Sequence, residues 1–139
     1  MELKAEYKKI IRNSSKIALA TSTYGIPNVR IVNYCYDDNK EGTIYFTTLK
    51  GTPKEKEFAL NENIAFTTVP DIGREHVRVL NATIRKSVRT LEELKELFTA
   101  QIPGFLNTYE VLGTHLVVYE VLFKNVTISL ASENGNLLL

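Results

Sequence analysis

The sequence predicts a mainly β protein: an antiparallel sheet of six or seven strands curled into a small barrel, with three helices outside it. Two observations favour this class. Six or seven runs rich in β-branched and aromatic residues are separated by turn signals along the chain. Short turns join the first four runs, which favours antiparallel pairing over strand–helix–strand units. The length of 139 residues fits a single domain over residues 1–139.

Composition argues against several classes of function. Hydrophobic residues make up 44% of the chain and charged residues 24%, as in ordinary globular domains. A net charge of +1 gives no reason to expect nucleic acid or a membrane surface as a partner. One cysteine precludes an internal disulfide, and two histidines without a cysteine cluster argue against a metal site. The N-terminus is too charged for a secretory signal and no run approaches the ~20 apolar residues of a membrane span, so we expect a cytoplasmic protein.

The first half of the chain shows one helical pattern and then strand patterns. Leu3, Tyr7, Ile10 and Ile11 share one face of a helix whose other faces are charged. The next run is apolar with small residues, as in a strand covered on both faces. The predicted elements are a helix at 2–12 and strands at 16–23, 29–36 and 43–48, joined by turns at 24–28 and 37–42.

The second half adds two helices and the remaining strands. Thr90 and Glu93 form a capping-box pattern, and the helix that follows carries the apolar stripe Leu91, Leu94, Leu97, Phe98 and Ile102. The chain ends in three leucines, which we expect to dock on the domain or on a second subunit. The predicted elements are a helix at 53–61, strands at 64–69 and 76–88, the stripe-bearing helix ending at Pro103-Gly104, a loop at 105–113, and strands at 114–121 and 125–130.

No catalytic motif is visible. The chain has no nucleophile elbow, no Walker loop, no dinucleotide glycine pattern and no zinc-protease helix. Cys35 lies in the middle of a predicted strand, so we expect a structural thiol. His76 and His115 also fall in predicted strands, where half-buried histidines are common. The catalytic residues are therefore unknown from the sequence.

One stretch suggests an anion site. The strand at 43–48 runs through Lys50 and Gly51 into a helix start, where Thr52 can act as N-cap, Pro53 suits the first helical position and Glu55 completes a capping box. A helix N-terminus offers free N–H groups and a positive dipole end, which together with the lysines make a phosphate cradle. The alternative is a well-capped surface helix with solvated lysines.

Arg30 is the second candidate. A hairpin would place the start of the strand at 29–36 beside the end of the strand at 43–48, so Arg30 and Thr48 would lie at one edge. Arg30 could then bind a phosphate that Thr48, Thr52 and Lys54 also hold. The alternative is that Arg30 pairs with Glu41 or another surface carboxylate.

Several motifs, in this order, resemble the pyridoxamine 5′-phosphate oxidase-like flavoproteins. They are Ile17-Ala18-Leu19-Ala20-Thr21, Gly25-Ile26-Pro27-Asn28-Val29-Arg30-Ile31-Val32, Ile44-Tyr45-Phe46-Thr47-Thr48, Gly51-Thr52-Pro53-Lys54 and Phe58. The resemblance covers roughly residues 15–82 and, more weakly, residues 117–128. It implies a Greek-key-like split β-barrel, a homodimer with FMN at its interface, and a small-molecule substrate.

The same resemblance assigns roles to individual residues. It implies that Arg30, Thr48, Thr52 and Lys54 hold the FMN phosphate. Lys50 is a further phosphate candidate, although it matches no fixed position of the family. The flavin ring would lie along the backbone of Arg30, Ile31 and Val32 and of Phe46 and Thr47. We expect Glu55 to face away from such a phosphate. The chain departs from the oxidase itself in its short length, in Pro53 where the oxidase has a basic residue, and in lacking the oxidase's C-terminal substrate-binding segment.

The leading hypothesis is therefore an FMN-dependent oxidoreductase that acts on an unidentified small molecule. A flavin carries hydride or single electrons itself, so a missing catalytic motif is no objection. A second hypothesis keeps the flavin but not the catalysis, as in a carrier or sensor. A third is a small barrel that binds single-stranded nucleic acid through its aromatic residues. Haem or a deazaflavin coenzyme could take the place of FMN, because relatives in this superfamily use them.

Overall fold

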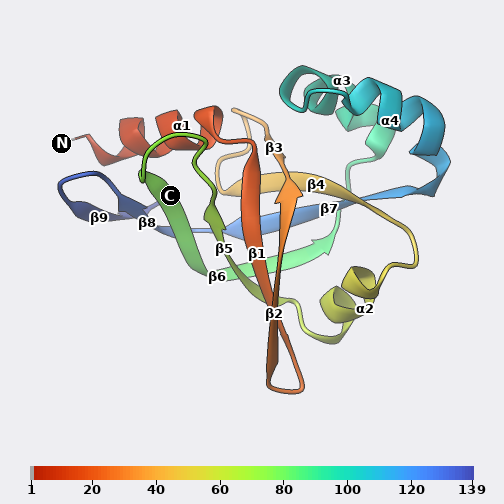
Figure 1. The fold of residues 1–139 in the computed structure, drawn as a ribbon, viewed down its shortest axis with the longest axis horizontal. Coiled ribbons are helices and arrows are strands. Elements are labelled where there is room, and N and C mark those ends of the chain that lie inside the picture. Colours follow the sequence, from red (N-terminus) through yellow and green to blue (C-terminus); the bar gives the residue numbers. More distant parts are fainter. Residues whose placement is uncertain (1) are drawn as a thin grey trace.

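The computed structural model describes residues 2–139, and its centre is one antiparallel sheet of nine strands (Figure 1). The main path through the sheet runs β2-β1-β5-β6-β7-β4-β3, and β8 and β9 extend it beyond β6. The strands are β1 (Lys16–Thr23), β2 (Ile26–Asn33), β3 (Cys35–Tyr36), β4 (Thr43–Leu49), β5 (Asn63–Thr68), β6 (His76–Lys86), β7 (Leu116–Phe123), β8 (Asn125–Ser129) and β9 (Asn134–Leu138). This confirms the predicted mainly β, antiparallel class, although the sheet has nine strands and not six or seven, because one predicted strand is divided into β2 and β3 and β9 was not predicted.

The sheet closes on itself through a single stretch of chain. β2 and β3 stand at opposite ends of the strand path, yet only Tyr34 separates them in the sequence. β2 pairs with β1, whereas β3 pairs with β4 through Cys35 opposite Tyr45 and Tyr36 opposite Ile44. Tyr34 is buried, and its hydroxyl donates to the Ile11 carbonyl at 2.7 Å. The chain therefore joins the two ends of the sheet, which makes the barrel.

The predicted pairing of the strands at 29–36 and 43–48 was wrong for most of its length. The expected single strand is divided into β2 and the two-residue β3, and only β3 reaches β4. Arg30 lies opposite Leu19 of β1 and not beside Thr48. The physical reason is that β2 forms a long hairpin with β1, with eight paired positions on each strand, and this hairpin carries β2 away from β4 (Figure 1).

Within residues 2–139 four α-helices, one more than predicted, and a short 3-10 helix, η1 (Gly113–His115), lie outside the sheet. α1 (Leu3–Asn13) covers one end of the barrel with Tyr7, Ile10 and Ile11 buried, as its predicted apolar face requires. α2 (Pro53–Leu60) follows β4, and α3 (Leu91–Gln101) and α4 (Phe105–Leu112) form a pair on the outer side of β4 and β7 (Figure 1). None of the helices described for residues 2–139 has both the length and the apolar character of a transmembrane span.

The expected loop at 105–113 was also wrong, because most of it is α4. Gly104 has φ 79°, a conformation that glycine adopts without strain, and it turns the chain sharply after α3. Phe105 then stacks on Phe98 of α3 with 5.0 Å between ring centroids, and Tyr109 lies one turn further along the same face. Tertiary packing against α3 thus stabilises a segment whose sequence has no helix-start signal.

Two of the three C-terminal leucines dock on the domain, which was one of the two predicted locations, the other being a second subunit. Residues 134–138 form β9, which pairs with β8 from Asn125 to Ser129. Leu137 and Leu139 contact the main core, whereas Leu138 is 70% exposed. This strand was not predicted, because a run of small polar residues and leucines carries no strand signal of its own.

Candidate functional site

The end of β4 and the start of α2 bring two threonine hydroxyls together. Gly51 has φ 80° in the connecting loop, so the chain turns tightly between the strand and the helix. The hydroxyl oxygens of Thr48 and Thr52 lie 3.4 Å apart, and Thr48 is only 4% exposed. Pro53 occupies the first turn, as predicted. The strand–loop–helix arrangement expected for residues 43–61 is therefore present.

The expected capping box at this helix start does not form. Thr52 occupies the N-cap position, but its side chain makes no capping hydrogen bond. Glu55 instead reaches back to the loop, where its Oε1 accepts a hydrogen bond from the Gly51 N–H at 2.7 Å. Its Oε2 accepts a hydrogen bond from the Tyr119 hydroxyl at 2.6 Å and lies 4.0 Å from Lys86 Nζ. These two hydrogen bonds, the one from Tyr119 first, lower the pKa of Glu55 below its ordinary value.

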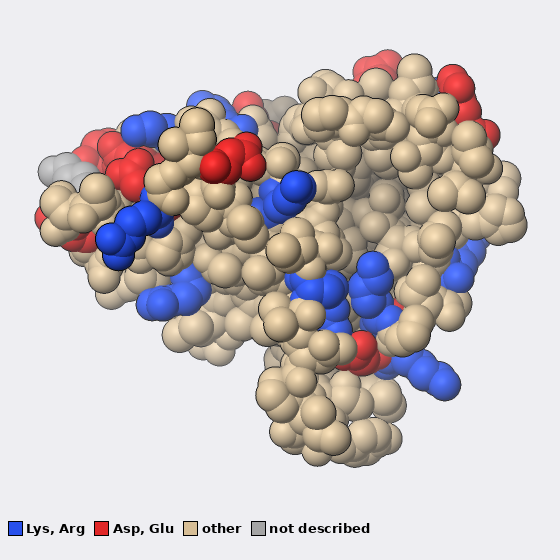
Figure 2. Space-filling model, viewed as in Figure 1, with Lys and Arg blue, Asp and Glu red and all other residues tan. Residues whose placement is uncertain are grey.

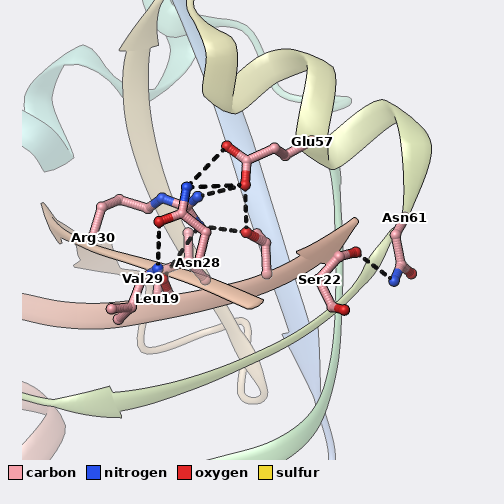
Figure 3. Close-up of polar contacts among 8 residues, drawn as sticks. Leu19, Ser22, Asn28, Val29, Arg30, Glu57 and Asn61 are labelled. Atoms are coloured by element: carbon pink, nitrogen blue, oxygen red, sulfur yellow. Dashed lines mark hydrogen bonds and ion pairs between the residues drawn. The ribbon is translucent and has the colours of Figure 1, made fainter. Parts of the chain in front are cut away.

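Arg30 lies against the same helix, but through a carboxylate. Its Nη2 donates to Glu57 Oε1 at 2.8 Å, and both side chains are largely buried, at 14% and 19% exposure (Figure 3). Its Nη1 donates to Thr21 Oγ1 at 2.9 Å and to the Leu19 carbonyl at 3.3 Å. The sequence-based alternative of a carboxylate partner for Arg30 is thus realised with Glu57. Glu41 pairs instead with Lys4 at 3.1 Å.

Glu57 is held by more than the arginine. Thr21 Oγ1 donates to its Oε1 at 2.8 Å, and Asn28 Nδ2 lies 3.3 Å and 3.4 Å from its two oxygens (Figure 3). Burial alone raises the pKa of Glu57, but the hydrogen bond from Thr21 and the charge of Arg30 outweigh it and hold the pKa below its ordinary value. The carboxylate is therefore charged at neutral pH.

The two backbone stretches expected to face a flavin ring are both open strand edges. β2 pairs with β1 along one side only, so the other edge of Arg30, Ile31 and Val32 has no strand partner within residues 2–139. β3 covers β4 only at Ile44 and Tyr45, so Phe46 and Thr47 are likewise open on that side. Some Cα atoms of β2 and β4 lie within 8 Å of each other. The split of the barrel lies between these edges.

The side chains of the remaining candidates point to different places. Ile31 is 62% exposed, Val32 is buried in the core, and Phe46 is fully buried and stacks on Tyr119 with 5.8 Å between centroids. Lys50 Nζ donates to the Thr114 carbonyl at 3.2 Å. Lys54 is partly buried and makes no hydrogen bond or ion pair with the described residues. Figure 2 shows lysine and arginine side chains gathered over the region of β2 and α2, with acidic side chains between them.

Sequence reasoning missed several residues at this site. These residues contact either Arg30, which was predicted to bind the cofactor, or helix α2. They are Glu57, Tyr119, Thr21 and Asn28. The sequence could show only that Glu57 lies one turn after Lys54 on α2. It could not show that Glu57 pairs with Arg30, because Arg30 lies on a strand 27 positions earlier. The others depend on strand pairing that no local pattern specifies.

Cys35 and His76 have structural surroundings, whereas His115 is exposed in the 3-10 helix before β7 and not in the predicted strand. Cys35 is fully buried, and burial raises the pKa of its thiol to about 12, in keeping with a structural role. His76 Nδ1 lies 2.8 Å from the Arg74 carbonyl. Within residues 2–139 no group of three or more histidine, cysteine, aspartate or glutamate side chains could hold a metal ion.

An antiparallel sheet that closes through β2 and β3 defines the class of split β-barrels. Within that class, the chain belongs to the pyridoxamine 5′-phosphate oxidase-like family, whose model matches residues 10–135. No curated protein is significantly similar to it in sequence.

Solved structures agree with the fold. A NimC/NimA family protein from Clostridium acetobutylicum is 20% identical with a TM-score of 0.70, and the match covers 100% of this chain and 95% of that one. An FAD-binding protein from Mesorhizobium loti is 17% identical with a TM-score of 0.65, covering 91% of both chains. A heme binding protein from Mycobacterium smegmatis is 15% identical with a TM-score of 0.71, covering 96% of this chain and 56% of that one.

Proposed function

We propose that this protein is an FMN-binding oxidoreductase that acts on a small molecule. The observation that carries the proposal is the pair of open strand edges, at residues 30–32 and 46–47, next to α2, which Arg30 contacts through Glu57 and Phe46 through Phe58. A flat ring system can lie along unpaired backbone groups, while a phosphate attached to it reaches a helix N-terminus. Family membership and the FAD-binding neighbour support a flavin, and the heme binding neighbour keeps haem as the alternative.

The donors present fit a phosphate in kind. The Thr48 and Thr52 hydroxyls lie together, Lys54 is free to bind at the second helical position, and Arg30 approaches α2 from the side. The three hydrogen bonds of Arg30 use at most three of its five N–H groups, so at least two have no acceptor within residues 2–139. Bound FMN would supply the hydride or electron transfer, and these residues would bind and orient it.

We also propose that the active form is a homodimer. β2 presents Ile26, Val29 and Ile31 at 69%, 64% and 62% exposure, on the strand whose outer edge is unpaired. An exposed apolar edge strand promotes aggregation of a monomer, but it can be buried in an interface with a second subunit. A second subunit covering it would also shield a ring bound at the same edge from water. Sedimentation at several concentrations tests this, and a monomer at all of them would contradict it.

The decisive experiment is the absorption spectrum of freshly purified protein, followed by titration with FMN and measurement of flavin fluorescence. We expect FMN to bind and to lose fluorescence. A nicotinamide donor should reduce the bound FMN, and a nitro, quinone or azo acceptor should then reoxidise it. A protein that binds no FMN contradicts the proposal. Bound FMN without reduction or turnover favours a flavin carrier or sensor, and a haem spectrum favours a haem protein.

A further inference from the structure

Two acidic residues of α2 are hydrogen-bonded to groups that a phosphate at this site could use. Glu57 is hydrogen-bonded to Arg30, and Glu55 is hydrogen-bonded to the Gly51 N–H in the loop before the helix. Building on the FMN function proposed above, we propose that Glu57 is a specificity-determining residue that weakens the binding of phosphate-bearing ligands at Arg30. The preference of the site for FMN over riboflavin is then smaller than its phosphate donors alone would give.

The first step in the argument is charge. Glu57 Oε1 is 2.8 Å from Arg30 Nη2, so the positive charge of the guanidinium is already balanced inside the protein. A phosphate that used the remaining N–H groups of Arg30 would lie within one guanidinium width of the carboxylate. Like charges at that distance repel strongly in a partly buried site, where solvent screening is reduced.

The second step is that Glu57 cannot easily move aside. Thr21 and Asn28 also donate to it, and both come from the β1–β2 hairpin, as Arg30 does. Asn61 Nδ2 donates to the Ser22 carbonyl at 2.9 Å and ties the end of α2 to the same hairpin (Figure 3). Displacing Glu57 therefore breaks several hydrogen bonds at once and leaves a charged group partly buried without a partner.

The third step is the same arrangement at the helix start. The Gly51 N–H donates to Glu55, so it is not available to a phosphate at the helix start. The Tyr119 hydroxyl donates to the other oxygen of the same carboxylate. Both acidic side chains have lowered pKa values and carry full negative charge at neutral pH. Glu55 thus adds to the repulsion that Glu57 exerts on a bound phosphate. A flavin without a phosphate is repelled by neither carboxylate.

The test compares dissociation constants of FMN and riboflavin by fluorescence titration for the natural protein and Glu57→Gln. Glutamine keeps the shape and loses the charge. We expect Glu57→Gln to bind FMN at least about tenfold more tightly, which is the size of one removed charge repulsion in a partly screened site, with riboflavin changed by less than about twofold. The control Glu62→Gln removes the same charge from an exposed residue just beyond α2 and should leave both constants unchanged.

Further variants make the outcome unambiguous. Adding Arg30→Gln to Glu57→Gln should abolish the gain, because the freed guanidinium is its source. If Glu57→Gln is too unstable to titrate, Glu57→Asp, which withdraws the carboxylate by one methylene, should give a smaller gain of the same sign. An unchanged ratio of FMN to riboflavin affinity in the variant, or a weaker FMN affinity, overturns the inference.

A probe without flavin separates this inference from the proposed function. Inorganic pyrophosphate should raise the melting temperature of Glu57→Gln more than that of the natural protein. If no flavin binds to either protein, the FMN function fails, and the pyrophosphate result alone decides the inference: equal shifts overturn it. If FMN binds tightly and equally to both proteins, the function stands and the inference falls.

Discussion

The hydroxyl of Tyr119 on β7 donates to Glu55 Oε2 on α2 at 2.6 Å, and the ring of the same tyrosine packs on Phe58, 5.0 Å away between centroids. One residue of the sheet therefore holds α2 twice, at its first turn by a hydrogen bond and at its second by an aromatic contact. Phe46 completes the group by stacking on Tyr119 and meeting Phe58 edge-on. The position of the candidate phosphate site follows from this contact between β4, β7 and α2.

Tyr119→Phe should lower the free energy of unfolding by about 1–2 kcal/mol, because it removes a hydrogen bond to a charged group and leaves the packing intact. The measurement is urea unfolding at neutral pH. Tyr109→Phe is the matched control, since the Tyr109 hydroxyl has no hydrogen-bond partner within residues 2–139, and its effect should stay within about 0.5 kcal/mol. Equal effects in the two variants would show that the Glu55 contact contributes nothing.

Phe58→Ala should destabilise the protein by about 3–5 kcal/mol, because it leaves a cavity among buried aromatic rings. Leu60 lies on the same helix but is 56% exposed, so Leu60→Ala should change the free energy of unfolding by about 0.5 kcal/mol or less. Urea unfolding of both variants checks this. A Phe58→Ala effect below about 1 kcal/mol would mean that α2 is not anchored by its buried ring.

Glu57→Gln should be less stable than the natural protein at pH 7, by about 1–2 kcal/mol, because the charged hydrogen bonds to Arg30 and Thr21 are weakened. The pKa of Glu57 is lowered in the folded protein, so its contribution is complete above the unfolded value of 4.5 and is lost as the pH falls through the lower folded value. The difference between the two proteins should therefore shrink below about pH 4.5. A difference that is constant from pH 7 to pH 3 would contradict this account.

Lys54→Ala should weaken FMN binding by about fivefold to tenfold, since it removes a positive charge at the first turn of α2, where the helix dipole also favours an anion. Lys56→Ala removes the same charge from an exposed position of the same helix and should have less than about a twofold effect. Fluorescence titration at fixed ionic strength measures both. Similar losses in the two variants would point to general attraction and not to a specific contact.

Cys35 should not react with a thiol reagent in the native protein at pH 8, because it is fully buried and its raised pKa leaves almost no thiolate. It is the chain's single cysteine, so the absorbance of the released reagent reports this one site. Labelling should become rapid and reach one equivalent in denaturant. Rapid labelling without denaturant would show that α3 and α4 open readily over the sheet.

Local signals in the sequence predicted most of the elements. The Thr90–Glu93 capping box is present with both of its hydrogen bonds, and the start of α2 at Pro53 agrees with its predicted position. Val77 and Val79 are buried two positions apart in β6, as the alternation of a strand requires. In each case the residues that decide the structure lie within a few positions of one another.

Features that depend on distant partners were not predictable in this way. Nothing in the sequence at Tyr34 marks the point where the chain leaves β1 for β4, because neither glycine nor proline interrupts the strand pattern from residue 29 to residue 36. The pairing of Arg30 with Glu57 was hidden for the same reason. Thr48 and Thr52 were correctly placed together because the loop between them is short.

The closure of the sheet through β2 and β3 also bears on how the protein folds. The ladder between β4 and β7 pairs residues 43–49 with residues 116–122. β3 closes the ring by pairing with β4, so β4 must already be in place in the sheet. Such distant pairings carry a large loop-closure entropy in the transition state, and proteins rich in them fold in milliseconds to seconds. A circular permutant opened at the β8–β9 turn would leave every one of these pairings in place, whereas one opened at Tyr34 would release the two ends of the sheet and turn a ring into an open ribbon.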